Sequence, residues 1–587
     1  MLRSRFAAFA ALLSLAAGCG SDSVSPGSTT PPPSPTPAAI SSIEVSPATT
    51  DLAIGATKAL VATARSAAGA VLTGRTLGWS TSASAVATVD ASGVVTAVGG
   101  GTATITVSGE GKSATAAITV KPSVIPVATV TIGLSLDTLE AYDPHTLTAV
   151  LRDSLNNVLT GRTVRWTSSN PAVASIDSVT GEVIGLDRGT VTITATSESK
   201  TGTASRVIVI KYRSVAAGSM HVCDIASGGF VWCWGLNGNE GRTGDPALGV
   251  NAMSSTPKLV PLTGYRALRF TQLSSYGTHT CGVTTTNRAY CWGNNSWGTL
   301  GDGSNSSQSN VPVPVAGGLF FRQVSTGADH SCGVTTDDRA FCWGHNDGKQ
   351  FANATPAMST TPVAVAPNMN FASISAGMSY TCGVTTSGAG FCWGANGLGQ
   401  TGDGQKISYG NTYQVTPVAV VGGAHFKSIE ASHSFTCGLT TANQLLCWGS
   451  DGGKLGSGNT GDTSTPVIAG NGISFSSVSA GNTHSCAVAA NAALWCWGAN
   501  GNGQLGVASP AVATSPVRAA GSLLVAEVSA SGVSTGFGAH TCTISSDRLT
   551  TYCFGRNETG QLGNGTTSIS TAVNSTPTIV VGQKPLP

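Results

Sequence analysis

From residue 212 onward, short apolar runs alternate with polar positions and turn residues, and the same pattern recurs seven times. Its clearest copy spans 330–344, where two β-prone runs flank a polar turn. Side chains alternate between the two faces of a strand, so both faces of these strands carry apolar or cysteine side chains. Such strands need cover on both faces, which stacked sheets supply. The pattern therefore predicts a β-hairpin within a repeat architecture.

Each repeat carries two more strand-like runs ahead of the hairpin. The first run spans residues 321–327 and has similar copies at 371–377 and 475–481. The second run begins Thr-Pro-Val and is clearest at 361–365. Four strands per repeat is the number that a propeller blade needs. After the hairpin comes Trp-Gly, or Phe554-Gly555 in the last repeat, and then a segment rich in Gly and Asn.

Two cysteines sit opposite each other on the arms of each hairpin. The seven pairs are Cys223 with Cys233, Cys281 with Cys291, Cys332 with Cys342, Cys382 with Cys392, Cys437 with Cys447, Cys486 with Cys496, and Cys542 with Cys553. The last pair is one residue further apart, which indicates a longer turn or a bulge. Thiolate ligands for zinc are the alternative, but zinc sites favour shorter spacings. The spacing therefore favours seven disulfides within the repeats.

His-Thr-Cys followed by Cys-Trp-Gly-x-Asn-x-x-Gly-Gln-Leu-Gly resembles the RCC1 (regulator of chromosome condensation) repeat family, over residues 212–587. The resemblance implies a seven-bladed β-propeller that binds proteins. Members of that family include a nuclear guanine-nucleotide exchange factor and a secreted bacterial inhibitor of β-lactamase. The matching positions are structural ones, so no functional residue is carried over from the family.

The two ends of the propeller region suggest how the ring closes. The first repeat begins at 212–218 without its own Thr-Pro-Val strand, and the C-terminal segment 576–581 supplies a spare one. Pairing these ends would remove two exposed sheet edges. We therefore expect closure by strand exchange between the first and last blades.

Two β-rich segments precede the repeats, at 40–121 and 126–211. Each has one central tryptophan, Trp79 or Trp166, and no cysteine. The stretch 85–97, matched again at 171–184, resembles the bacterial Ig-like domains of group 2. The resemblance implies two small β-sandwiches that act as spacers, with binding to carbohydrate or a host surface as the alternative. We expect an all-β protein in which two Ig-like domains precede the propeller.

Residues 1–19 have a basic start and an apolar run too short to span a membrane. The run ends Leu15-Ala-Ala-Gly-Cys19, which resembles a bacterial lipobox with Ala16 where Leu is commonest. Of 15 cysteines, Cys19 alone lies outside the pairs, which favours a lipid-attachment site over a signal peptide with a stray cysteine. Residues 20–39 are rich in Pro, Ser and Thr and read as an extended tether.

Charge and cysteine usage narrow the setting. Charged residues make up 10% of the chain and the net charge is +2, so the composition carries no electrostatic footprint for nucleic acid. Paired cysteines and a targeting segment indicate an oxidising, extracytoplasmic space. We expect a membrane-anchored monomer, at an outer membrane or cell surface, that touches the membrane through its anchor alone.

Few residues suggest chemistry. A histidine lies two residues before the first cysteine in five repeats, whereas Tyr380 and Phe435 replace it in the other two, so packing is favoured over a metal ring. Gly-Asp-Gly at 301–303 and 402–404 is weakly similar to a calcium loop, and turns explain it as well. No nucleophile elbow, triad spacing or phosphate loop is present. We expect no enzyme activity, cofactor or metal.

The candidate recognition residues lie in the connections after Trp-Gly, which all leave the same strand end. The fourth connection is the longest and carries Lys406, Tyr409 and Tyr413; the second carries Trp297. Aromatic side chains on polar loops suit interface anchors, although they could instead fold back onto the blades. We expect a lipid-anchored binding or adhesion protein whose partner is a protein or surface glycan. The alternatives are a secreted regulator or inhibitor of an enzyme and, by analogy, a guanine-nucleotide exchange regulator.

Overall fold

The computed structural model describes residues 37–122, 124–133, 136–249, 251–261, 268–406, 413–532, 539–568 and 573–582. All regular structure in these ranges is β, apart from one 3-10 turn at Ser227–Gly229. The predicted all-β class is confirmed. In the described part of the chain, no helix is long and apolar enough to cross a membrane. The chain divides into two compact units, Met1–Pro126 and Val127–Pro587, which are described separately.

The first unit is a β-sandwich domain of nine strands in three sheets, ordered β1-β4, β3-β7-β6 and β2-β9-β8-β5. Alternating apolar residues such as Ile105, Val107 and Ile118 point inward and are fully buried. Trp79 packs on Gly93, where φ is +88° and a Cβ would lie 2.7 Å from the indole. The strands are β1 (Ser42–Ser46), β2 (Thr49–Ala53), β3 (Thr57–Ala59), β4 (Val61–Arg65), β5 (Gly78–Thr81), β6 (Ala87–Val89), β7 (Val94–Ala97), β8 (Gly101–Gly109) and β9 (Lys112–Lys121).

The second unit opens with a domain of closely similar topology. Its sheets are β10-β13-β14, β11-β19-β18-β15 and β12-β17-β16, and Trp166 packs on Gly181 as Trp79 packs on Gly93. The strands are β10 (Thr129–Gly133), β11 (Thr138–Glu140), β12 (Pro144–Thr146), β13 (Thr148–Arg152), β14 (Val158–Leu159), β15 (Arg165–Ser168), β16 (Ala174–Ile176), β17 (Glu182–Gly185), β18 (Gly189–Ser197) and β19 (Lys200–Val209).

This second sandwich is joined closely to the repeat domain. Only two residues separate β19 from the next strand, and one hydrophobic cluster runs across the junction. Glu140 accepts a hydrogen bond from the Arg213 guanidinium at 2.6 Å, and Arg188 donates to the Tyr212 hydroxyl at 2.8 Å. The rings of Tyr142 and Phe230 lie 4.7 Å apart. The second sandwich therefore packs against the repeat domain instead of leading into it through a tether.

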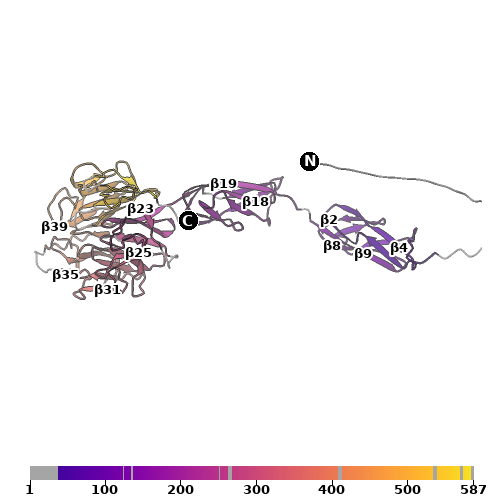
Figure 1. Cartoon of the computed structure of the whole chain (residues 1–587), viewed down its shortest axis with the longest axis horizontal. Coiled ribbons are helices and arrows are strands. Elements are labelled where there is room, and N and C mark those ends of the chain that lie inside the picture. Colours follow the sequence, from indigo (N-terminus) through magenta and orange to yellow (C-terminus); the bar gives the residue numbers. More distant parts are fainter. Residues whose placement is uncertain are drawn as a thin grey trace, which may run out of the picture. The chain divides into compact units, whose positions relative to one another are not determined.

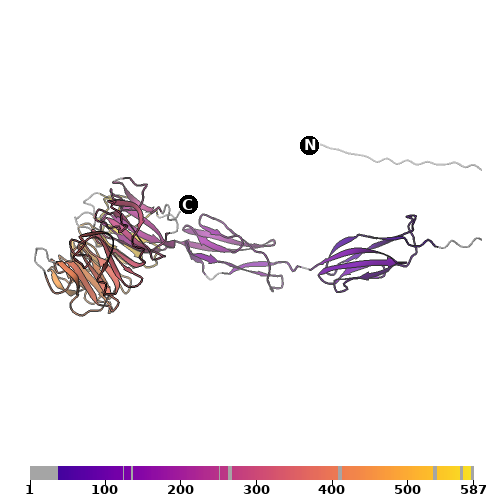
Figure 2. The ribbon, with the colours of Figure 1, turned by 90° about the horizontal axis from the view of Figure 1, so that it is seen from below.

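Residues 212–582 form seven four-stranded antiparallel sheets, each made of four consecutive strands. Figure 1 shows them following one another around the domain, from β23 through β31, β35 and β39 back to the yellow strands beside β23, and Figure 2 gives the view at right angles. The innermost strands of neighbouring sheets contact each other around the whole ring. We number the sheets as blades 1 to 7.

The strands have four positions in a blade. Innermost are β20 (Tyr212–Ala217), β24 (Phe270–Ser275), β28 (Phe321–Thr326), β32 (Phe371–Ala376), β36 (Phe426–Ala431), β40 (Phe475–Ala480) and β44 (Val525–Ala530). Second are β21 (His221–Ala226), β25 (His279–Thr284), β29 (His330–Thr335), β33 (Tyr380–Thr385), β37 (Phe435–Thr440), β41 (His484–Ala489) and β45 (His540–Ser545). Third are β22 (Phe230–Leu236), β26 (Ala289–Asn294), β30 (Ala340–His345), β34 (Gly390–Ala395), β38 (Leu445–Gly449), β42 (Leu494–Ala499) and β46 (Thr551–Gly555). Outermost are β23 (Met253–Leu259), β27 (Gln308–Pro314), β31 (Met358–Val365), β35 (Tyr413–Ala419), β39 (Thr463–Ala469), β43 (Val512–Arg518) and β47 (Thr578–Ile579).

The predicted hairpins are the second and third strands of each blade. The two cysteines of each hairpin lie directly opposite each other, and all seven predicted pairs are joined as disulfides. The bonds join Cys223 to Cys233, Cys281 to Cys291, Cys332 to Cys342, Cys382 to Cys392, Cys437 to Cys447, Cys486 to Cys496, and Cys542 to Cys553. The extra residue in the last pair lengthens the turn between Ile544 and Thr551 and leaves the register at the cysteines unchanged. Every one of these cysteines is fully buried, as the two-faced cover of the strands requires.

The expected strand exchange between the chain ends is wrong. The Thr-Pro-Val strand pairs with the hairpin before it, so β23 completes blade 1 and β47 completes blade 7. The ring closes through contacts between complete blades: Tyr212 N donates to Arg548 O at 2.8 Å, and Val215 N donates to the Glu527 carboxylate at 3.0 Å. The loop that leads from a hairpin to its Thr-Pro-Val strand is longer than the loop that follows that strand, so connection length alone does not predict this pairing.

Side chains join the innermost strands of neighbouring blades. A serine at the fifth position of five of these strands accepts a hydrogen bond from a backbone N–H of the next blade; the serines are Ser274, Ser325, Ser375, Ser479 and Ser529. Ala216 and Glu430 occupy this position in the remaining two blades. Bonds between side chain and backbone thus cover an inner edge that has no strand partner.

Candidate protein-binding face

Strand direction places two sets of loops on one side of the propeller. In each antiparallel blade, the loop between the first and second strands and the loop between the third and fourth strands leave at the same end. The first set surrounds the axis and the second set lies further out. We call this side the loop face. Loops on a rigid scaffold are where binding residues usually lie.

The outer loops are fixed at their base by the asparagine of the repeat motif. Its side-chain oxygen accepts a backbone N–H within the same loop, as in Asn295 with Leu300 at 3.0 Å. Asn237, Asn346, Asn396, Asn500 and Asn557 make the equivalent bond, and Asp451 replaces asparagine in blade 5. The motif asparagine is therefore a loop anchor.

The last glycine of the motif contacts the tryptophan of the next blade. At Gly301, φ is +66° and a Cβ would lie 2.6 Å from the Trp343 indole, so only glycine suits both the backbone and the space. The Trp343 indole N–H donates to the Thr299 carbonyl at 2.9 Å. The motif therefore holds neighbouring blades together.

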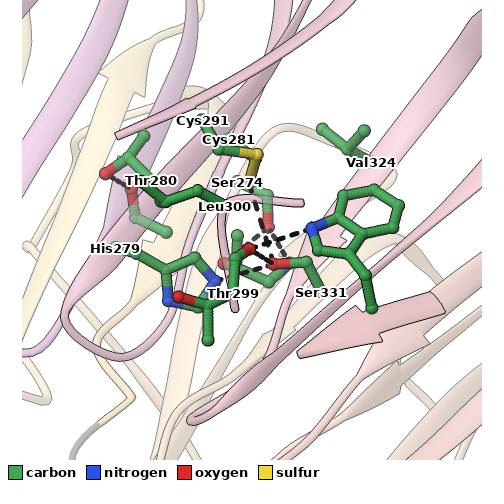
Figure 3. Close-up of a disulfide and its surroundings, with 12 residues drawn as sticks. Ser274, His279, Thr280, Cys281, Cys291, Thr299, Leu300, Val324 and Ser331 are labelled. Atoms are coloured by element: carbon green, nitrogen blue, oxygen red, sulfur yellow. Dashed lines mark hydrogen bonds between the residues drawn. A yellow bond between two sulfur atoms is a disulfide. The ribbon is translucent and has the colours of Figure 1, made fainter. Parts of the chain in front are cut away.

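The recurrent histidines lie at the same interface between blades. His279 Nε2 is 2.8 Å from the Ser331 hydroxyl of the next blade, and that hydroxyl donates to Thr299 O at 2.9 Å (Figure 3). The single hydroxyl proton goes to the carbonyl, so His279 donates through Nε2–H. His330 with Thr381 and His484 with Thr541 repeat this arrangement.

These histidines are fully buried and neutral. Burial lowers the pKa of His279 to about 4 and the pKa of His330 and His484 to about 3. Tyr380, which replaces histidine in blade 4, hydrogen-bonds across to Phe435 O at 2.5 Å. Within the described residues, no three His, Cys, Asp or Glu side chains are grouped as metal ligands. The structure places these histidines in packing positions.

The Gly-Asp-Gly segments form turns. The Asp302 carboxylate accepts Ser304 N at 3.1 Å, and the Asp403 carboxylate accepts Gln405 N at 3.0 Å. Each carboxylate caps its own loop, which agrees with the turn interpretation.

Three of the four candidate recognition residues, Trp297, Lys406 and Tyr413, are exposed on the loop face. Trp297 is 43% exposed, although its ring lies 4.5 Å from the His345 ring of the next blade. Tyr413 begins β35 and is 37% exposed. The Lys406 ammonium donates to Asp462 O at 2.7 Å, which ties one outer loop to the next. Tyr409 lies outside the described residues.

The structure also shows a cavity of about 210 Å³ at the axis on the loop face, which the sequence did not predict. Tyr276 lies against it, at a position where the other six repeats have only Gly or Ser, namely Gly218, Gly327, Gly377, Ser432, Gly481 and Ser531. The Tyr276 ring reaches Gly532 of blade 7, where a Cβ would lie 2.4 Å from it. A tyrosine in a position otherwise held by small residues was the signal to follow.

Charged groups line this cavity. The Arg242 guanidinium is buried and makes two hydrogen bonds to the Glu240 carboxylate, at 3.2 and 3.3 Å, and one to Ser219. Asp329 and His433 also line the wall. Burial raises the pKa of the Asp329 carboxyl and lowers the pKa of His433. Arg242 stands where four other repeats have the motif glutamine, a second departure that sequence comparison between repeats could have found.

Family models match most of the described chain. A model described as RCC1-like domain matches residues 180–517, and a model described as bacterial Ig-like domain (group 2) matches residues 39–120 and 147–208. The chain is 28% identical over 150 residues to the mitochondrial RCC1 domain-containing protein RUG3 of Arabidopsis thaliana, covering 25% of this chain and 33% of that protein. It is 31% identical over 140 residues to the human E3 ubiquitin-protein ligase HERC2, covering 23% of this chain and 3% of that protein. The chain thus spans a third or less of these relatives.

Solved structures share the propeller fold. Human WBSCR16 matches with a TM-score of 0.50 and 21% identity, over 57% of this chain and 87% of that one. Yeast RCC1 (Prp20), solved with Kap60, matches with a TM-score of 0.51 and 19% identity, over 60% of this chain and 83% of that one.

Proposed function

Because the chain belongs to the RCC1-like domain family, we propose that its propeller is a protein-recognition head that docks a partner on the loop face. The observation that carries this proposal is the exposure of Trp297 and Tyr413 on loops whose bases are fixed by the repeat motif. Aromatic side chains held on a rigid surface are favoured interface anchors. The structure of yeast RCC1 bound to Kap60 gives a relative that binds a protein.

In this proposal the two Ig-like domains are a spacer and the whole protein is anchored outside the cytoplasm through a lipid on Cys19. Cys19 lies outside the described residues, and its role rests on the sequence around it. Seven disulfides in the repeats support an oxidising compartment. The propeller would then bind its protein partner or surface glycan at a distance from the membrane.

Cross-linking capture with defined variants tests the docking face. The full-length protein and the double variant Trp297→Ala/Tyr413→Ala are cross-linked in the native envelope, and the captured proteins are identified by mass spectrometry. We expect the double variant to lose at least tenfold of the specific capture with a nearly unchanged melting temperature, because both side chains are substantially exposed.

Phe320→Ala is the matched control. Phe320 is 50% exposed and stacks under Arg288, on the side of the propeller opposite to the loop face. This variant should capture normally. Capture that survives the double variant, or that depends on Phe320, would place the binding site elsewhere. Loss of capture together with a lowered melting temperature would make the two aromatic side chains packing residues.

A further inference from the structure

The axial cavity opens on the face where we propose that the partner docks. Among the residues that the structure describes, six of the seven blades contribute to its wall and blade 6 contributes none. Its volume of about 210 Å³ lies below the ~300–1,000 Å³ of sites for drug-sized ligands and cofactors. The space suits a single protruding side chain better than a cofactor.

The Asp329 carboxylate is the unbalanced charge of this cavity. It is partly buried, and its side chain has no hydrogen bond or ion pair within the described part of the chain, although the His345 ring acts on it electrostatically. The main-chain oxygen of Asp329 accepts His345 N at 2.8 Å, and the His345 ring pairs with Asp347 at 3.0 Å. A partly buried carboxylate without a hydrogen-bond partner is poorly compensated for its lost hydration, and a cation would compensate it.

The nearby cations are engaged elsewhere. Arg242 is paired with Glu240, so its charge is balanced within its own loop. Lys454, whose charge acts on His433, directs its ammonium group to the hydroxyls of Ser434 and Ser450. Neither supplies a counter-ion to Asp329 in the structure.

The remaining wall suits the aliphatic part of a basic side chain. Met220 and Met378 contribute flexible thioethers, and Tyr276 contributes an aromatic ring next to the cavity. Lys and Arg bury their methylene stems on apolar surface, and their charged groups are attracted to aromatic rings. One carboxylate, one ring and two thioethers thus complement an alkyl chain that ends in a cation.

We propose that the axial cavity receives the ammonium or guanidinium group of a basic side chain presented by the protein docked on the loop face, with Asp329 as its counter-ion. This proposal rests on the proposed function, because the same face must meet the partner. The cavity then gives the head specificity for a partner that carries a protruding Lys or Arg.

Methyl NMR of the full chain labelled at its methionines tests the cavity directly. Met220 and Met378 lie in the wall, whereas Met253 and Met358 begin outer strands on the same face and serve as internal controls. The probes are a glycine-flanked lysine pentapeptide, its uncharged norleucine counterpart and free n-butylammonium. We expect the lysine peptide to shift the two cavity methyl signals selectively, and Asp329→Asn to weaken this binding at least tenfold.

Asp337→Asn is the charge-matched control, since Asp337 belongs to blade 3 but lies in the hairpin turn at the opposite end. Equal shifts with the norleucine peptide, or unchanged binding in Asp329→Asn, would overturn the proposal. Shifts with n-butylammonium but not with the lysine peptide would make the cavity a site for free amines and would also overturn it. The capture experiment with Trp297 and Tyr413 is independent, so failure of the cavity and failure of the docking face are distinguishable.

Discussion

The propeller and the first Ig-like domain are both all-β, but they are stabilised by different means. The domain at 40–121 has no cysteine and no histidine, and its core is a cluster of small and β-branched side chains. The propeller has a disulfide in every blade, and buried hydrogen bonds connect each blade to the next. Apolar burial is insensitive to redox state and pH, whereas disulfides and buried neutral histidines are not. The two regions should therefore respond differently to the same change of solution.

Loss of the disulfides should give the largest difference. Each closes a loop of about eleven residues and contributes about 2–3 kcal/mol in the chain-entropy model. Seven such contributions exceed the net stability of a typical domain, about 5–15 kcal/mol. We expect protein refolded in a reductant to lose hydrogen-exchange protection throughout the propeller while residues 42–121 keep theirs. Equal protection of the propeller with and without reductant would contradict this.

Acid should give the second largest difference in stability between the propeller and the first Ig-like domain. Free histidine has a pKa of about 6.5, so these histidines bind protons below that pH in the unfolded chain. In the folded propeller they stay neutral until the pH reaches their folded pKa values of about 3 to 4. The stability that these histidines provide is complete above pH 6.5 and is lost as pH falls. At pH 5 the free energy of unfolding should be lower by about 2 kcal/mol for each of His279, His330 and His484. Urea unfolding at pH 7.5 and 5, followed by hydrogen exchange, should show this loss in the propeller and little change in the first Ig-like domain.

His330→Phe is the control for the acid effect, because Phe435 already occupies the corresponding position in blade 5. It should reduce the slope of stability against pH by about 1.4 kcal/mol per unit between pH 6 and 4.5. A slope identical to that of the unchanged protein would show that buried histidines do not cause the acid sensitivity.

Glu430 should give the smallest effect, with the opposite dependence on pH. Burial raises the pKa of its carboxyl to about 7, so its cost to stability is absent below pH 4.5, grows as the pH rises from 4.5 to 7 and is complete above pH 7. Five other blades have serine here. We expect Glu430→Ser to stabilise the propeller by about 1–3 kcal/mol at pH 8 and by nothing measurable at pH 4.5. The histidines outweigh this single carboxyl in acid. Equal stabilisation at both pH values would mean that shape, not charge, distinguishes the two side chains.

Local features of this fold could be predicted from the sequence, and distant ones could not. The hairpin register and all seven cysteine pairs follow from strand alternation and a cysteine spacing that is the same in six repeats and one residue longer in the seventh. The hairpin with which each Thr-Pro-Val strand pairs could not be predicted, because the sequence pattern is compatible with either neighbouring hairpin. That ambiguity produced the wrong strand exchange.

The candidate site divides in the same way. Trp297 and Tyr413 could be singled out because an aromatic residue on a polar loop is visible locally. Asp329, His433 and Tyr276 come from three blades and meet only because the ring closes. Tyr276 was detectable as a departure from Gly and Ser at one position of the repeat, but its approach to Gly532 depends on the curvature of the ring.

The anchoring of the outer loops has a consequence for how the protein can change. The asparagine and the glycine fix the first turn of each loop, and the asparagine amide also donates to a main-chain carbonyl further along, such as Ser306 O at 2.8 Å in the second loop and Pro510 O at 2.9 Å in the sixth. Side-chain substitutions beyond the first turn leave these bonds and the disulfides in place, because the acceptors are main-chain carbonyls. Each outer loop can therefore change its sequence separately, and a new binding specificity can arise in one loop while the other six stay unchanged. The same modularity makes the propeller a scaffold for displaying designed loops in oxidising environments.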